Sequence, residues 1–252
     1  YIRRSGGSLA STSLGTGSYN IFYTGNPLTT TSEIAGSGLQ NINVALDAGR
    51  TLTLSGTVTL KSDLTVASGT LDVGTLVLKR FSSGGVMSVA DGATLKIGAN
   101  NMPQSFNTHT FAGNSNVEYY GADQEIAPEV NTGYGNLTLS GTGTKTITAG
   151  SAVTVKSNLV TDNRLIIKSD TLTSNGSLIV KGTTTGSVTY IRQLSRRIFN
   201  NNQYISSPVV SNTDPNTDNV KKVYRYNEVL GSWESVTAGL TDLQSGIGYN
   251  LA

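Results

Sequence analysis

The sequence contains no cysteine. Disulfide bonds, thiolate metal sites and thiol nucleophiles are therefore excluded. Histidine is almost absent too, because His109 is the only one among 252 residues. A catalytic or metal-binding histidine needs partners, and here none of them can be a second histidine or a cysteine. We interpret His109 as a surface or turn residue of a strand, and we expect no metal and no cofactor.

Charge is also scarce. Charged residues make up 13% of the chain, about half the roughly 25% of an ordinary soluble domain. A formal net charge of +2 is too small to indicate a nucleic-acid partner. No apolar run approaches the roughly 20 residues of a membrane helix. The first residues, Tyr1-Ile2-Arg3-Arg4, lack the apolar stretch of a signal peptide, so we expect a segment of a longer protein without membrane insertion.

Glycine, threonine, serine and asparagine separate short runs of valine, leucine and isoleucine. Helix-forming stretches rich in alanine, glutamate and lysine are missing. Because β-branched side chains crowd a helix and suit a pleated surface, the composition predicts an all-β fold.

A tandem repeat of about 95 residues is visible in the sequence. Asn41-Ile42-Asn43-Val44 returns as Asn136-Leu137-Thr138-Leu139, and residues 58–64 return at 153–159 with the same offset of 95. Upstream, Asn20-Ile21-Phe22-Tyr23 corresponds to residues 116–119 at an offset of 96. We therefore expect two tandem units within residues 19–192.

A third trace of the repeat stands at the two ends of this region. Tyr1-Ile2-Arg3 matches Tyr190-Ile191-Arg192 at an offset of 189, which is close to two unit lengths. We interpret residues 1–18 as the end of a preceding repeat or a linker.

Within a unit, apolar residues alternate with polar ones at the period of a strand with one buried face. Strands this short, joined by glycine, serine and aspartate turns, predict a parallel β-solenoid whose triangular coils hold roughly 18–20 residues. Leu52 is expected to stack on Leu71, and Val58 on Leu76, with Gly56, Gly69 and Gly74 at corners. The uneven spacing of the pairs favours a right-handed β-helix. The pairs are Leu52/Leu54, Val58/Leu60, Leu64/Val66, Leu71/Val73 and Leu76/Leu78.

The composition changes after Arg192. From residue 193 the aliphatic pairs stop, and asparagine, proline and aromatic residues arrive. Residues 223–226, 233–236 and 248–251 read as antiparallel strands separated by glycine and asparagine turns. We predict a small antiparallel β module over residues 193–252, and the chain need not contain all of that module.

Phosphate binding, polysaccharide cleavage and glycan binding are the alternatives to a purely structural role of the repeat. Residues 141–146 resemble a phosphate-binding loop, but Thr144 occupies the position before the lysine where the motif requires glycine. Acidic residues of the solenoid are mostly single, which argues against a polysaccharide lyase or hydrolase, although such enzymes do use β-helices. A carboxylate-rich groove present on one unit only would favour the enzyme.

The other alternative is glycan binding by the C-terminal module. Basic and aromatic side chains gather there, and such residues can contact acidic polysaccharide and stack on sugars. A solvated module surface, with Trp233 in the core, explains the same residues. The candidate glycan contacts are Arg196, Arg197, Tyr224, Tyr226 and Trp233.

Residues 116–126 and 134–146 resemble the repeat region of large bacterial surface adhesins exported through the type IX secretion system, including gliding-motility adhesins. Residues 204–209, 223–226, 231–233 and 246–249 are similar to a module that often follows such repeats. The resemblance covers residues 19–252.

The resemblance implies a secreted, non-enzymatic structural or adhesive segment at the bacterial cell surface, acting as a stiff stalk or scaffold. It also implies neighbouring repeats of the same polypeptide, surface polysaccharide and the secretion or anchoring machinery as partners. Asp170-Thr171-Leu172 matches a pattern on which such bacteria place O-glycans, so Thr171 is a candidate for modification.

Overall fold

A computed structural model describes residues 1–9, 14, 17–26, 28–129, 132–170, 174–191, 203–206, 223–236 and 248–251. The chain divides into two compact units, Tyr1–Gln193 and Leu194–Ala252. Among the described residues the only helical turn is a short 3-10 helix, η1 (Ser32–Ala35). The predicted all-β class is confirmed.

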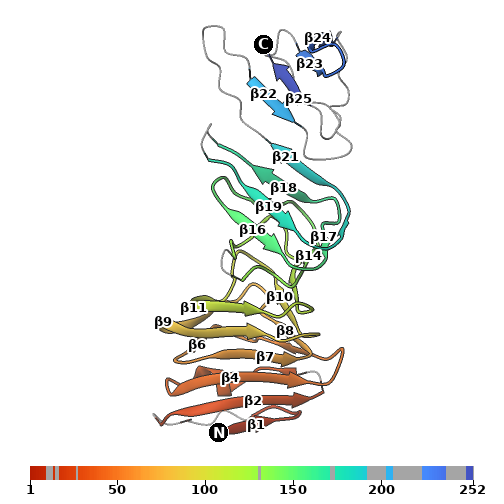
Figure 1. Cartoon of the computed structure of the whole chain (residues 1–252). Coiled ribbons are helices and arrows are strands. Elements are labelled where there is room, and N and C mark those ends of the chain that lie inside the picture. Colours follow the sequence, from red (N-terminus) through yellow and green to blue (C-terminus); the bar gives the residue numbers. More distant parts are fainter. Residues whose placement is uncertain are drawn as a thin grey trace. The chain divides into compact units, whose positions relative to one another are not determined.

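The first unit is a parallel β-solenoid whose coils stack as three walls (Figure 1). Wall A contains β1 (Ile2–Arg4), β2 (Tyr19–Gly25), β4 (Leu39–Leu46), β7 (Leu64–Ser68), the second half of β9 (Leu78–Val89) and β11 (Gln104–Phe111). Wall B contains β3 (Leu28–Thr29), β5 (Thr51–Thr53), β8 (Thr70–Asp72), β10 (Thr94–Ile97), β12 (Asn116–Tyr119), β14 (Asn136–Leu139), β17 (Leu159–Val160) and β20 (Thr184–Thr185). Wall C contains β6 (Val58–Leu60), the first half of β9, β13 (Gln124–Glu125), β15 (Lys145–Ile147), β18 (Leu165–Lys168) and β21 (Val188–Ile191).

Wall A continues beyond β11 into β16 (Ala152–Val155) and β19 (Ser177–Val180). The coil between β11 and β16 has no regular strand on this wall. In that coil Thr132 donates its hydroxyl to the backbone oxygen of His109 at 2.7 Å. Two residues later, Tyr134 forms a parallel bridge with Val155. The chain therefore passes through the walls in the constant order A, B, C.

The start of the chain is part of this stack. Ile2 pairs in parallel with Ile21, and Arg4 with Tyr23, so the first residues of the expected repeat end or linker form a strand of wall A. The boundary between the two units follows Gln193, next to the predicted boundary after residue 192.

The strand register confirms one predicted stacking and corrects another. Leu52 pairs with Leu71 as predicted, but Val58 pairs with Leu78 rather than with Leu76. A turn in which Leu76 donates its backbone N–H to Val73, at 3.1 Å, takes up the two extra residues. The coils are also longer than predicted in places, since Leu71 pairs with Leu95, 24 residues on.

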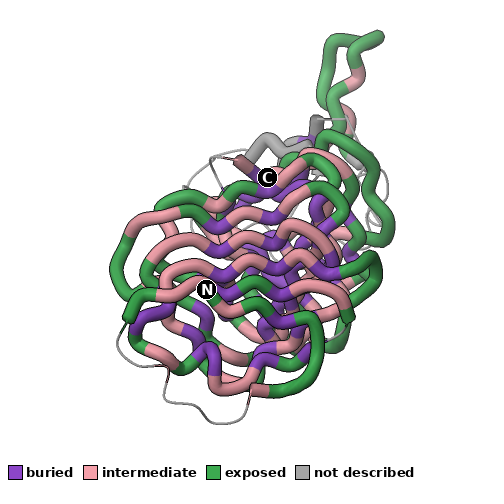
Figure 2. Tube along the Cα trace, turned by 90° about the horizontal axis from the view of Figure 1, so that it is seen from below, coloured by how far each residue is buried: buried purple, intermediate pink, exposed green. Residues whose placement is uncertain are grey.

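The inward-facing side chains form one continuous apolar interior, visible as the buried core of the stacked coils in Figure 2. Leu52, Leu64 and Leu71 are completely buried, while the intervening Thr53 and Thr65 are partly exposed on the outer face. Burial of each such leucine contributes about 1.5–3 kcal/mol. Repetition of this contribution along the stack stabilises the solenoid.

Asparagine and aspartate side chains link successive coils at the start of a wall. Asn20 Oδ1 accepts from the Asn41 backbone N–H at 3.2 Å and from its Nδ2 at 2.8 Å. Asn41 Oδ1 accepts from the Asp63 N–H at 2.9 Å, and Asp63 Oδ1 from the Val86 N–H at 2.8 Å. These bonds satisfy backbone N–H groups near the corners of the coil. Without them, these groups would need water as their hydrogen-bond partner.

A buried lysine closes one turn of wall C. Lys145 is completely buried, and its ammonium donates to the backbone oxygens of Gly121 and Ala122 at 2.7 Å and of Thr142 at 3.0 Å. Burial, together with the charge of Arg164, lowers the pKa of Lys145. The residue is therefore a structural clamp across two coils.

We expect Lys145→Met to lower the free energy of unfolding by about 2 kcal/mol, because three carbonyl oxygens lose their donor. Arg50 occupies the corresponding position of the other unit and is exposed, so Arg50→Met is the matched control, with a change within about 0.5 kcal/mol. Urea unfolding of the full chain measures both. Equal changes in the two variants would contradict the clamp.

The second unit contains a four-stranded antiparallel sheet in the order β22 (Gln203–Ser206), β25 (Gly248–Leu251), β23 (Val223–Asn227) and β24 (Ser232–Val236). β23 and β24 form a hairpin that pairs Tyr226 with Trp233. The predicted antiparallel module is confirmed for these strands.

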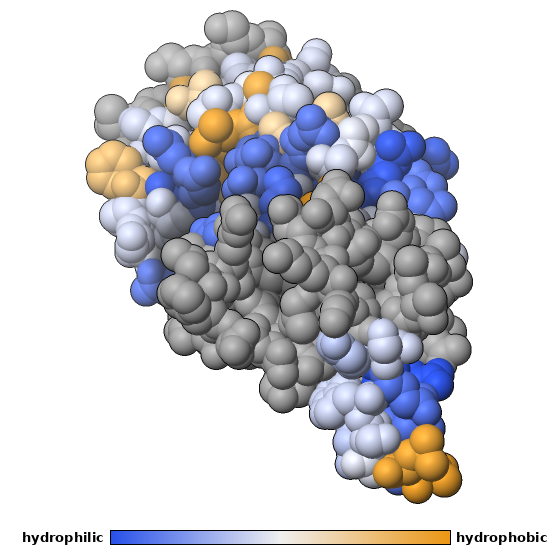
Figure 3. Space-filling view, turned by 90° about the horizontal axis from the view of Figure 1, so that it is seen from above, coloured by the Kyte–Doolittle hydropathy of each residue, from blue (hydrophilic) through white to orange (hydrophobic). Residues whose placement is uncertain are grey.

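On the face that Figure 3 shows, the hydrophobic side chains of the described residues occur as separate patches.

Candidate functional site

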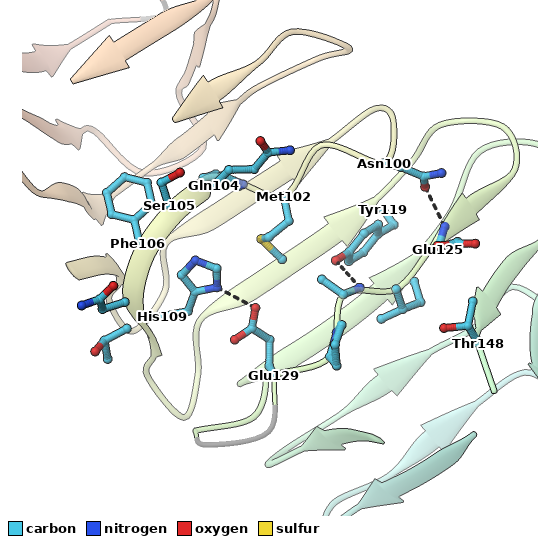
Figure 4. A pocket seen from close by; sticks show the side chains of 16 residues that line it. Asn100, Met102, Gln104, Ser105, Phe106, His109, Tyr119, Glu125, Glu129 and Thr148 are labelled. Atoms are coloured by element: carbon cyan, nitrogen blue, oxygen red, sulfur yellow. Dashed lines mark hydrogen bonds and ion pairs between the residues drawn. The ribbon is translucent and has the colours of Figure 1, made fainter. Parts of the chain in front are cut away.

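An open cleft of about 570 Å³ lies among the described residues where the first and second repeat units meet (Figure 4). It lies where walls A and C lack regular strands at the described residues 98–103, 126–129 and 132–133. The floor and sides combine apolar and polar side chains. The principal lining residues are Asn100, Met102, Gln104, Ser105, Phe106, His109, Tyr119, Glu125, Ile126, Glu129 and Thr148.

Polar side chains replace the missing ladder bonds beside the cleft. Asn101 donates its Nδ2 to the backbone oxygens of Gly74, at 3.0 Å, and Leu76, at 2.5 Å. Gln124 donates its Nε2 to the oxygens of Ile97, at 3.1 Å, and Ala99, at 2.8 Å. The interrupted wall therefore keeps its carbonyl groups satisfied without a strand.

The rim of the cleft contains an irregularity of β11. The pairing of β11 with β9 shifts register between Gln104 and Phe106, and Ser105 between them has a φ of +64°. A left-handed conformation is uncommon for a residue with a side chain. Such a bulge turns side chains away from their regular direction, and it brings Phe106 to the cleft.

A hydrogen bond joins His109 and Glu129 at the edge of the cleft. The distance from His109 Nδ1 to Glu129 Oε1 is 2.7 Å, and the two side chains are 16% and 10% exposed. The imidazole lies between Phe106 and Phe111, whose ring centroids are 6.3 Å and 6.2 Å away. His109 Nε2 is buried and has no hydrogen-bond partner in the structure. His109 lies in strand β11, in keeping with the expected strand residue, but its side chain is more enclosed than that of a surface residue.

Tyr119 lines the cleft and shares a hydrogen bond with the buried Tyr134. The hydroxyls of Tyr119 and Tyr134 are 3.0 Å apart, Tyr119 accepts from the Ala127 N–H at 3.1 Å, and Tyr134 donates to the Ala127 oxygen at 2.7 Å. Burial raises the pKa of Tyr119 to about 12. Both phenols are therefore neutral hydrogen-bonding groups at ordinary pH.

Part of this site has a sequence counterpart at the start of the first repeat unit. Tyr23 and Glu33 precede Tyr119 and Glu129 by 96 residues. There the cation beside the glutamate is Arg4, and its guanidinium contacts the carboxylate directly. Both members of this pair are almost completely buried.

The titratable residues that line the cleft are His109, Tyr119, Glu125 and Glu129. A histidine held by a glutamate can act as a base, yet its second nitrogen is covered by other side chains. Glu125 and Glu129 are the only carboxylates that line the cleft. Within the described part of the chain, no three histidine, aspartate or glutamate side chains lie close enough together to hold a metal ion.

We expect Glu129→Gln to lower the free energy of unfolding by about 1 kcal/mol, because a part-buried charged hydrogen bond becomes a neutral one. The effect should vanish in a His109→Phe background, where the amide has lost the same partner. Chemical unfolding of the two single variants and the double variant measures the coupling. Additive changes would contradict a direct interaction between the two side chains.

The structure locates only part of the predicted glycan site. Arg196 and Arg197 lie outside the described residues, as does the candidate glycosylation residue Thr171. Tyr226 and Trp233 meet edge to face with ring centroids 5.3 Å apart, and they are 42% and 39% exposed. Trp233 is thus more exposed than the expected core residue, while Tyr224 on the same strand is half-buried.

Comparison of the chain with protein-family models, with curated proteins and with solved structures gives no match. The described residues include no helix with the length and apolarity to span a membrane. Functional inference therefore rests on the solenoid, on the cleft and on the hairpin of the second unit.

Proposed function

We propose that the chain is a non-enzymatic structural and adhesive segment of a long extracellular protein of the bacterial cell surface, and that it acts as a stiff stalk. The supporting observation is the continuous apolar interior, which runs through every coil of the first unit. Because each coil of a solenoid contacts only its neighbours, such a stack lengthens without a change of fold when units are added. The repeated 95-residue unit supplies such additions.

The stalk is tested by lengthening it. Insertion of one further copy of residues 41–135 at the unit boundary should increase the maximum dimension in small-angle X-ray scattering by about 20 Å, given a strand spacing of about 4.8 Å per coil. A flexible glycine–serine insert of equal length serves as the control. An unchanged dimension, or one that matches the flexible control, would reject the stalk.

The surface location has a separate test. Export through the type IX secretion system, a part in gliding or adhesion, and contact with surface polysaccharide or anchoring machinery are proposed from the resemblance of residues 116–126 and 134–146. Antibodies raised against residues 1–193 should label intact source cells and lose that label after brief surface proteolysis. Label that appears only after cell lysis would reject a surface protein.

A second candidate function is glycan binding by the C-terminal unit, and the edge-to-face pair of Tyr226 and Trp233 favours it. Exposed aromatic faces stack on sugar rings. Binding of the full chain on a glycan array, lost in Trp233→Ala and retained in Phe81→Ala, would support this function. Phe81 is an exposed aromatic residue of the solenoid, outside the C-terminal unit, and is thus the matched control. Equal binding by the two variants would reject it.

A polysaccharide lyase or hydrolase is the remaining alternative. Incubation of the chain with acidic and neutral polysaccharides, with and without calcium, should release no new reducing or unsaturated ends. Release of such ends that stops in Glu125→Gln or Glu129→Gln would replace the structural proposal by an enzymatic one.

A further inference from the structure

The sequence repeat and the walls of the solenoid are out of phase. The chain passes through the walls in the order A, B, C, and four coils separate β4 on wall A from residues 132–134 on the same wall. The sequence counterpart of β4 is not that segment but the next strand, β14, on wall B. One unit therefore advances the chain by four coils and one wall.

The same displacement holds along the whole unit. β5 on wall B corresponds to β15 on wall C, β6 on wall C to β16 on wall A, and β7 on wall A to β17 on wall B. Upstream, β2 on wall A corresponds to β12 on wall B. Every aligned strand thus lies one wall further round.

The third trace of the repeat agrees with this displacement. Tyr1-Ile2 and Tyr190-Ile191 are two unit lengths apart. Ile2 lies in β1 on wall A, whereas Ile191 lies in β21 on wall C, two walls further round. Successive units therefore rotate in one direction.

The corner hydrogen bonds rotate with the sequence. Asn41 accepts from the Asp63 N–H at the start of wall A, at 2.9 Å. Its counterpart Asn136 accepts from the Asn158 N–H at the start of wall B, at 3.1 Å. Equivalent asparagines therefore make the same inter-coil bond on walls A and B.

From this displacement we infer that equivalent surfaces of successive units face different sides of the solenoid and return to the same side only every third unit. Copies of one partner can then bind neighbouring units without competing for space. A flat partner surface, by contrast, meets equivalent sites from every third unit alone. The importance of this for a long protein rests on the proposed stalk, but the rotation is a property of this chain.

Distances between spin labels test the rotation directly, and the absence of native cysteine makes the labelling specific. Thr59 and Thr154 are equivalent outward-facing positions on walls C and A, whereas Thr65 and Thr154 lie four coils apart on wall A. The Thr65→Cys/Thr154→Cys pair should give a distance centred at roughly 20 Å, the height of four coils. The Thr59→Cys/Thr154→Cys pair should be longer, since it also crosses between walls. Equal distances, or the reverse order, would overturn the rotation.

The consequence for partners is tested with an identical peptide tag inserted in the equivalent turns at Gly56 and Ser151. Two antibody fragments should bind one chain at once and project from different sides in electron micrographs. Projection from the same side, or binding of a single fragment, would overturn the inference. Neither result depends on the scattering test of the stalk, so failure of the stalk and failure of the rotation are distinguishable.

Discussion

Replacement of Gly141 by alanine is expected to lower the free energy of unfolding by about 4 kcal/mol or more. The added Cβ would lie 1.8 Å from the backbone oxygen of Tyr120 and 2.8 Å from that of Gly121, in the coil beneath. Backbone oxygens of a stacked coil cannot withdraw without breaking the ladder. Gly141 also has a φ of +78°, which adds a conformational cost of about 1–2 kcal/mol for alanine.

Gly92→Ala is the matched control for this substitution. Gly92 has nearly the same conformation, with a φ of +75°, but a Cβ built there meets no atom within 4 Å. We expect Gly92→Ala to lower the free energy of unfolding by the conformational cost alone, about 1 kcal/mol. Thermal and urea unfolding of both variants separate the two contributions. A Gly141→Ala loss no larger than that of Gly92→Ala would show that the coils are not stacked this closely.

The solenoid could be predicted because apolar and polar residues alternate along each of its short strands. Leu52 and Leu71 stand at the same place in successive aliphatic pairs, and the structure pairs them. The partner of Val58 could not be predicted, since the sequence does not show that the turn at Gly74 is two residues longer than expected. The alternation fixes which residues face inward, whereas the length of each corner fixes the register.

The cleft escaped prediction for a related reason. His109 and Glu129 are 20 residues apart, and they meet only because they lie in neighbouring coils. The one available signal was the match of Glu129 with Glu33 across the repeat, beside the matching Tyr119 and Tyr23. A titratable residue that recurs within an apolar repeat indicates a buried partner, but the sequence does not name that partner.

The rotation of the units was likewise hidden in the sequence. The offset of 95 between Asn41 and Asn136 is plain, but its meaning depends on the coil length, which we expected to be roughly 18–20 residues. The observed spacings include 19 residues from Leu52 to Leu71 and 22 from Ile42 to Leu64. The number of coils in one unit therefore became known only from the register.

The charged pair of Arg4 and Glu33 provides the second large effect, because both side chains are removed from solvent. The Arg4 guanidinium contacts the Glu33 carboxylate and lies 5.8 Å from the centre of the Tyr23 ring. Glu33 also accepts from the Tyr23 hydroxyl at 2.8 Å and from the Thr31 N–H at 3.0 Å. Burial alone would raise the pKa of Glu33, but the hydrogen bonds from Thr31 and Tyr23 outweigh it and lower that pKa.

Arg4→Met should lower the free energy of unfolding by about 3–5 kcal/mol at pH 7, because it leaves a buried carboxylate without its cation. The double variant Arg4→Met/Glu33→Leu should recover most of the loss, since no charge remains to be compensated. Lys96→Met is the control: it breaks the ion pair with Glu118, 3.2 Å apart and partly exposed, and should change stability by less than about 1 kcal/mol.

The pH dependence distinguishes a lost charge partner from lost packing. The lowered pKa of Glu33 means that its stabilisation is present above the ordinary carboxyl pKa of about 4.3 and is lost as pH falls through the lower folded value. Without the adjacent cation we expect the folded pKa of Glu33 to rise in Arg4→Met, so that the carboxyl takes up a proton at higher pH and the uncompensated charge disappears. The deficit of Arg4→Met relative to the unmodified chain should therefore shrink between pH 7 and pH 4 in urea unfolding. A deficit that stays constant over this range would mean that Arg4 acts through the packing of its aliphatic stem, and the buried ion pair would then contribute nothing.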